Sequence, residues 1–153
     1  GAYEIEMGVS LRDVIEKLAG GLREGRTLQA VLIGGAAGAF LRPDEIDVPL
    51  DFQSLASVGA AFGSGAIMVL DDTADLRGVL YRIARFFKDE SCGKCFPCQL
   101  GTQRQFEIIA RGAMFRETSL LRELGATMRD ASICGLGQTA SSAIESALNK
   151  KLV

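Results

Sequence analysis

The sequence predicts an α+β protein in two parts, a small sheet domain followed by an all-helical domain. Strand-like and helix-like patterns alternate in the first part, whereas the second part carries only helical apolar patterns. Charge divides near the same boundary: residues 1–75 hold five Lys or Arg against twelve Asp or Glu, and residues 76–153 hold twelve against seven. We therefore expect one domain over residues 1–72 and a second over residues 73–153.

The first part begins with a predicted strand and a predicted helix. Residues 3–7 alternate apolar and charged side chains, which is the pattern of a strand with one solvated face. Ser10 then caps a helix, with Asp13 as a weaker form of capping box, and Gly20–Gly21 ends it. Its apolar stripe consists of Leu11, Val14, Ile15 and Leu18.

Two further apolar runs predict buried strands, one within residues 27–35 and one within residues 63–72, with an irregular loop between them. The glycine-rich stretch at residues 34–38 has no Gly-x-Gly-x-x-Gly pattern and no Walker-type lysine, so we interpret it as a turn and not as a phosphate site. The order strand, helix, strand, loop, strand indicates a small β-grasp-like sheet with one helix across it.

The second part predicts four helices. Asp72 or Thr73 caps the first, which runs directly into a cysteine-rich loop. The second begins near Gly101 and ends at Gly112, the third follows, and the fourth lies after Cys134. Each of the four helices carries an apolar stripe, and together the stripes predict a common bundle core. In chain order the stripes are Leu76, Val79, Leu80, Ile83, Phe86 and Phe87 in the first helix; Phe106, Ile109 and Ala110 in the second; Leu120, Leu121, Leu124 and Met128 in the third; and Ala143, Ile144, Ala147 and Leu148 in the fourth.

Several classes of function are excluded or disfavoured. The arginines of the basic half are scattered through helical segments with few aromatic partners, so we expect solvated helix faces and no nucleic-acid partner. The chain has no histidine, which excludes a histidine general base, a catalytic triad and a histidine-ligated zinc. No carboxylate pair is evident, and no catalytic residue is expected.

The cysteines carry the chemistry that remains. Cys92, Cys95 and Cys98 are each separated by two residues, and Cys134, the last of the four cysteines, lies beyond a further thirty-five residues. We expect a cytoplasmic protein without direct membrane insertion, because no apolar window spans a bilayer and the N-terminus lacks a basic, signal-like start. A reducing compartment keeps thiols available as metal ligands, which favours metal binding over disulfides.

Three thiolates on one loop and one distant thiolate favour a [4Fe–4S] cluster held by Cys92, Cys95, Cys98 and Cys134. Zinc is the strongest rival, since it also accepts four thiolates, although structural zinc sites usually come as two separated Cys-x-x-Cys pairs. Disulfides or free thiols remain a third alternative. Gly93, Gly135 and Gly137 lack side chains that would keep backbone amides away from sulfur.

The motifs ESCGKCFPCQLGTQR, residues 90–104, and ASICGLGQTA, residues 131–140, resemble the cluster-binding region of the NADH-oxidising flavoprotein subunit shared by respiratory complex I, NAD-reducing hydrogenases and NAD-dependent formate dehydrogenases. Upstream, residues 7–21, 30–41 and 55–72 resemble the soluble-ligand-binding β-grasp domain that precedes the cluster domain in that family. The resemblance thus covers essentially the whole chain.

This resemblance implies that Cys92, Cys95, Cys98 and Cys134 are the four cluster ligands. The FMN- and NADH-binding domain of the family has no counterpart here, so FMN and NAD(H) are expected only in a full-length parent subunit. The chain is then a C-terminal fragment or a short relative, and its start at Gly1 favours a fragment. Gln99, where many relatives have arginine, and the continuation LGTQRQ look more like the formate dehydrogenase branch of the family.

The function implied by the resemblance is electron transfer within an NAD(H)-dependent oxidoreductase, without catalysis by this fragment alone. The cluster would relay single electrons from reduced flavin to further iron–sulfur centres. Partners would be other iron–sulfur subunits, including a ferredoxin-like small subunit, in the cytoplasm or at the cytoplasmic face of a membrane complex. The alternative is a structural or docking module with a four-cysteine zinc site or a cluster that relays no electrons.

Overall fold

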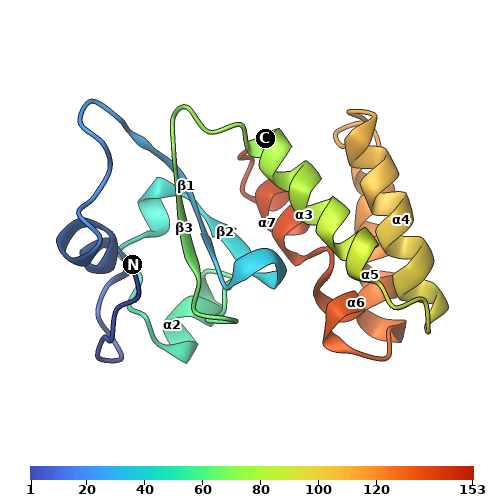
Figure 1. The fold of residues 1–153 in the computed structure, drawn as a ribbon, viewed down its shortest axis with the longest axis horizontal. Helices are drawn as coiled ribbons and strands as arrows, with labels where there is room; N and C mark the ends of the chain where they lie inside the picture. The colour runs from blue at the N-terminus through green and yellow to red at the C-terminus, as the bar shows by residue number, and fades with distance from the viewer. The chain divides into compact units, whose positions relative to one another are not determined.

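The computed structural model describes all residues from 1 to 153, which divide into a sheet-containing unit, Gly1–Ala74, and a helical unit, Asp75–Lys151. Figure 1 shows both, with the first unit in blue to green and the second in green to red. The α+β class predicted from the sequence is confirmed. No helix is both long enough and apolar enough to cross a membrane.

Three short antiparallel strands form the sheet of the first unit (Figure 1). They are β1 (Leu28–Ile33), β2 (Ala39–Leu41) and β3 (Ile67–Asp71), in the order β2-β1-β3. Val31 of the central strand lies opposite Leu41 on one side and Val69 on the other. The last four residues of β1 are all buried, which accounts for its continuous apolar run, because such a run requires both faces of the strand to be covered.

A tight turn joins β1 to β2. Gly34 and Gly35 have φ angles of +95° and +77°, which residues with a side chain adopt only with strain. A Cβ atom on Gly34 would also lie 3.0 Å from the carbonyl oxygen of Ala61. The short helix η2 (Gly35–Ala37) completes the reversal. The interpretation of residues 34–38 as a turn is confirmed.

The predicted helix of the first unit begins as expected. Ser10 Oγ accepts a hydrogen bond of 3.1 Å from the amide of Asp13, and the helical stretch comprises α1 (Leu11–Asp13) and η1 (Val14–Leu18). Leu18 is 44% exposed, so the predicted stripe is one residue too long. The core that this stretch shares with the sheet consists of Leu11, Val14, Ile15, Val31, Ile33, Ala39, Leu41, Ile46, Val48, Leu50, Leu55 and Ala60.

Two predictions for the first unit are wrong. Residues 3–7 form no strand, because an alternating pattern needs a neighbouring strand to bond its backbone, and the contact to residues 49–50 begins only at the amide of Gly8. The predicted irregular loop also contains β2, the short helix η3 (Pro43–Glu45) and α2 (Phe52–Ser57). These elements are too short for their periodicity to be recognised.

The second unit contains five helices in place of the predicted four: α3 (Leu76–Glu90), α4 (Phe96–Ala110), α5 (Thr118–Ala131), α6 (Gly135–Thr139) and α7 (Ser142–Asn149). Helix α4 packs against α3, α5 and α6, and α7 packs against α3 and α5 (Figure 1). The short helix α6 escaped prediction because five residues carry barely more than one helical turn.

Helix α3 begins later than predicted. Its cap is Asp75, whose carboxylate accepts a hydrogen bond of 3.0 Å from the amide of Gly78, and not Asp72 or Thr73. The carboxylate of Asp71 bonds Thr73 in the preceding turn, which leaves Asp75 as the acidic residue next to the free amides of the helix. The predicted stripe is buried except for Phe86, which is 47% exposed.

Helix α4 begins five residues earlier than predicted, at Phe96 instead of near Gly101. Pro97 fits in the first turn because the amide that proline lacks has no intrahelical partner there. Gly101 lies inside the helix, where a Cβ atom would come within 2.6 Å of the sulfur of Met128. This glycine therefore allows α4 and α5 to approach closely and does not mark a helix end.

The remaining helical stripes agree in part with the prediction. Leu121 and Met128 of α5 are buried, but Leu120 is 42% exposed. In α4 the buried apolar residues near the C-terminal end are Ile108 and Ile109, whereas the predicted Ala110 is exposed. The predicted stripe of α7 is buried at Ala143, Ile144 and Ala147.

Candidate metal centre

The four cysteines are free thiols placed at or near two helix starts. Cys92 is exposed in the loop after α3, and Cys95 is half-buried at the residue that precedes α4. Cys98 is buried in the first turn of α4, and Cys134 is exposed at the residue that precedes α6. Neither Cys95 nor Cys134 makes a side-chain capping hydrogen bond of good geometry at the start of its helix.

The loop between α3 and α4 owes its shape to glycine and proline. Gly93 has a φ angle of +71°, a conformation in which a side chain is strained, and it reverses the chain after Cys92. Pro97 follows at the start of α4 with its fixed φ angle. Cys95 and Cys98 consequently lie one helical turn apart and share one face of α4.

The Cys95 sulfur is surrounded by hydrogen-bond donors. The amide of Ile133 is the main group that lowers the pKa of this thiol, and the amide of Cys98 and the hydroxyl of Ser132 lower it further. Each donor stabilises the thiolate over the thiol. Since Ile133 adjoins Cys134, the segment that carries the fourth cysteine reaches Cys95.

The Cys98 sulfur has the opposite environment. Burial raises the pKa of this thiol, and the neighbouring charges of Cys95 and Cys134 raise it further, while Ser91 acts against them. Ser91 Oγ lies 3.4 Å from the Cys98 sulfur. Cys98 therefore lies within electrostatic range of two other predicted residues, Cys95 and Cys134.

The segment from Ser132 to Gly137 packs directly on this region. A Cβ atom at Gly137 would collide with Ser132 Oγ and would lie 2.8 Å from Cys98 Cβ, so only glycine allows this approach. Gln138 Nε2 donates a hydrogen bond of 3.0 Å to the Ser132 carbonyl and closes the turn before α6. By contrast, a Cβ atom at Gly135 would meet nothing within 4 Å.

No three cysteine, histidine or acidic side chains lie close enough together to hold a single metal ion. Cys92 in particular is exposed in the loop after α3. The region nevertheless has the features of a sulfur-ligated metal group. The side chains that could act as metal ligands here are all thiols. In addition, the hydroxyl of Ser132, a residue that is 7% exposed, has no hydrogen-bond partner of good geometry in the chain. The residues present thus fit an iron–sulfur group.

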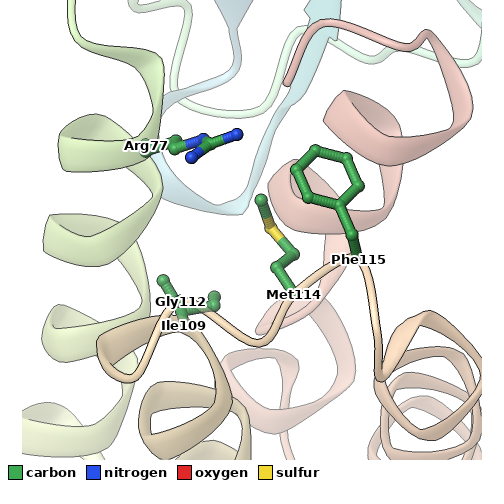
Figure 2. A pocket seen from close by; sticks show the side chains of 5 residues that line it. All are labelled: Arg77, Ile109, Gly112, Met114 and Phe115. Atoms are coloured by element: carbon green, nitrogen blue, oxygen red, sulfur yellow. The ribbon is translucent and has the colours of Figure 1, made fainter.

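A small pocket of about 50 Å³ lies elsewhere in the helical unit (Figure 2). Figure 2 shows Arg77, Met114 and Phe115 around it, with the Arg77 guanidinium 5.4 Å from the centre of the Phe115 ring. Arg77 is at the start of α3 and Ile109 at the end of α4, so the pocket lies at the opposite end of this helix pair from the cysteine loop. A helix of 15 residues is about 22 Å long, which separates the pocket from the cysteines.

A match to a known family agrees with this geometry. Residues 78–150, which include all four cysteines, match the family described as the NADH-ubiquinone oxidoreductase-F iron-sulfur binding region. The resemblance seen in the cysteine motifs is therefore confirmed, and the family that matches is described by its iron–sulfur binding.

Particular relatives extend the similarity over nearly the whole chain. The chain is 37% identical to the HndC subunit of the NADP-reducing hydrogenase of Solidesulfovibrio fructosivorans, over 97% of this chain and 31% of the relative. It is 36% identical to the F 2 subunit of the NADH-quinone oxidoreductase of Rhizobium meliloti, over 97% of this chain and 36% of the relative. The chain thus spans about a third of the length of these relatives.

A solved structure also shares the fold. The crystal structure of an NAD⁺-reducing [NiFe]-hydrogenase in the air-oxidized state has a TM-score of 0.81 and 32% sequence identity over 99% of this chain and 27% of that chain. The same enzyme type in the H2-reduced state gives a TM-score of 0.80 at 30% identity. The relatives named here are hydrogenases and NADH-quinone oxidoreductases, and the formate dehydrogenase branch inferred from Gln99 stays a prediction.

Sequence reasoning identified the cysteines but missed the polar residues around them. Ser91 precedes Cys92 directly and Ser132 precedes Cys134 by two residues, so proximity to the motifs was the available signal. Gln105 had no such signal, since a glutamine in a helix is normally exposed. It is fully buried, and its side chain bonds the segment after Cys134.

Proposed function

We propose that Cys92, Cys95, Cys98 and Cys134 together bind one [4Fe–4S] cluster and that the chain serves as a single-electron relay. The contact of the Ile133–Gly137 segment with both Cys95 and Cys98 carries this proposal. It supports a common site for cysteines that are separated by thirty-five residues in the sequence. The family match over residues 78–150 supports iron and sulfur as its occupants.

Each part of the chain has a separate task in this site. The start of helix α4 holds Cys95 and Cys98 one turn apart, and the amides of its first turn favour negative charge on sulfur. The packing of Gly137 on Cys98 positions Cys134. Cys92 sits on the glycine-containing loop, whose exposure allows it to turn toward the other three when the cluster is assembled.

When bound, the cluster supplies one-electron chemistry between reduced flavin and further iron–sulfur centres. The flavin and the NAD(H) site would belong to a parent subunit, either the β subunit of an NAD-dependent formate dehydrogenase or the flavoprotein subunit of an NADH dehydrogenase. The partners would be other iron–sulfur subunits, including a ferredoxin-like small subunit. The names of the relatives support membership of such a complex.

The domain assignment is part of the same proposal. We assign residues 1–72 to a soluble-ligand-binding β-grasp domain and residues 73–153 to the helical cluster domain. The division into the units Gly1–Ala74 and Asp75–Lys151 supports this assignment to within two residues. The antiparallel sheet with a helical stretch in its core supports the β-grasp interpretation.

The test is the metal content of anaerobically prepared protein matured with intact cluster assembly. We expect about four iron and four sulfide per chain, as a cubane cluster requires, and a paramagnetic signal on reduction. Cys134→Ala should lose most of this iron, whereas replacement of the exposed Ser119, which lies on α5 away from the cysteine loop, should not. Stoichiometric zinc without iron would overturn the proposal and favour the structural or docking role.

A further inference from the structure

The hydroxyl of Ser132 is held in a buried position beside two cysteines. Ser132 is 7% exposed, and its Oγ atom lies next to Gly137 together with Cys98 Cβ. It also lies near enough to the Cys95 sulfur to act on that thiol. No acceptor of good geometry in the chain receives its proton. A buried hydroxyl without a partner costs free energy, so this position requires an explanation.

Ser91 makes a related contact from the other side. Its Oγ atom lies 3.4 Å from the Cys98 sulfur, across seven residues of sequence and the whole Gly93 turn. Sulfur is a weak acceptor when it carries a proton and a much better one as a thiolate bound to metal. The hydrogen bonds that the two serine hydroxyls can donate to the neighbouring sulfurs are thus strong only when those sulfurs are negatively charged.

We propose that Ser132 and Ser91 are positioning residues that donate hydrogen bonds to the sulfurs of the bound cluster and raise its reduction potential. This inference rests on the cluster proposed above. Reduction adds one electron, and therefore one negative charge, to the cluster and its thiolates without forming or breaking a bond. Hydrogen bonds to sulfur stabilise the more negative state, so each donor makes reduction more favourable.

The experiment compares Ser132→Ala and Ser91→Ala with the parent protein, each prepared anaerobically with its cluster. Midpoint potentials are measured by redox titration with paramagnetic resonance detection. We expect each substitution to lower the equilibrium constant for reduction by roughly threefold to tenfold, where tenfold corresponds to about 59 mV for a one-electron couple. Pulsed resonance in D2O should also show one exchangeable deuteron fewer near the reduced cluster.

Ser141→Ala is the matched control, because Ser141 is a buried serine, 3% exposed, that packs against Gly125 of α5. It should change neither the potential nor the deuteron signal. Full iron content with an unchanged potential and unchanged deuteron signal in both test variants would overturn the serine proposal while leaving the cluster proposal intact. Absence of iron from the unsubstituted protein would instead contradict the cluster proposal and, with it, the serine proposal.

Discussion

Gln105 of α4 donates a hydrogen bond of 2.9 Å from its side-chain amide to the carbonyl oxygen of Ala140, which follows α6. Both residues are fully buried. The bond ties the helix that carries Cys98 to the segment that follows Cys134, so it connects the two parts of the candidate site. The other side-chain atom, Gln105 Oε1, is buried without a partner.

Replacing Gln105 by leucine should destabilise the helical unit moderately. The Ala140 carbonyl would lose its donor, which costs about 1–3 kcal/mol for a buried group, and removal of the unpartnered Oε1 would offset part of that loss. We expect a net loss of about 1 kcal/mol in urea unfolding. Gln103→Leu, an exposed substitution on the same helix, should change stability by less than about 0.5 kcal/mol. Equal effects of the two variants would contradict this role for Gln105.

Gly137→Ala should disturb the site by overpacking. The added methyl group would collide with Ser132 and approach Cys98, at a cost of about 1–3 kcal/mol in unfolding free energy. Gly135→Ala, two residues earlier in the same short helix, enters open space and should change stability by less than about 0.5 kcal/mol. Chemical denaturation of the metal-free protein measures both. A Gly137→Ala variant as stable as Gly135→Ala would show that Ser132 and Cys98 do not pack as described.

Cys134→Ala should loosen the helical unit of the cluster-loaded protein while leaving the first unit unchanged. Cys134 is separated from Cys98 by thirty-five residues, so its ligation closes a loop that contains α5. Hydrogen exchange measures the effect, with faster exchange expected within residues 96–149 and parent-like exchange within residues 1–74. Full protection of the helical unit together with unchanged iron content would show that Cys134 is not a ligand.

In metal-free protein, alkylation should discriminate between Cys95 and Cys98. The Ile133 amide lowers the pKa of the Cys95 thiol, whereas burial raises that of Cys98. The pH at which Cys95 becomes reactive should therefore lie below the ordinary cysteine value, and that of Cys98 above it. Near pH 7 Cys95 should therefore react faster than Cys98, since the thiolate is the nucleophile and Cys95 has the larger thiolate fraction. Peptide mass spectrometry measures both rates, and urea-unfolded protein, where they should be similar, is the control.

Asp75→Ala should weaken the start of α3. Loss of the carboxylate that accepts from the Gly78 amide should cost about 0.5–2 kcal/mol, as for other helix caps. Thr73→Ala, which alters a candidate cap that the helix does not use, should cost less than half as much. Thermal or urea unfolding of the two variants checks this, and a larger loss for Thr73→Ala would restore the cap first predicted from the sequence.

Several elements could be predicted because their signals are local. The Ser10 cap, the central strand β1 and the stripe of α3 depend on residues within one or two turns of each other. The wrong predictions concern segments whose structure depends on contact with a part of the chain that is distant in sequence. Residues 3–7 have a strand pattern but no strand to pair with, and Gly101 has the composition of a helix end but serves a helix contact with Met128.

The candidate site divides in the same way. Its chemistry follows from the sequence alone, because four cysteines with this spacing and no histidine leave thiolates as the only soft metal ligands, and the motifs around them suffice to recognise the family. Which polar groups surround the sulfurs was decided only by the tertiary structure. Ser132 and Gly137 lie next to Cys98 because the segment around α6 packs on α4. The hydrogen bond from Gln105 of α4 to Ala140 joins the same two segments, which are about thirty-five residues apart and whose contact no local pattern encodes.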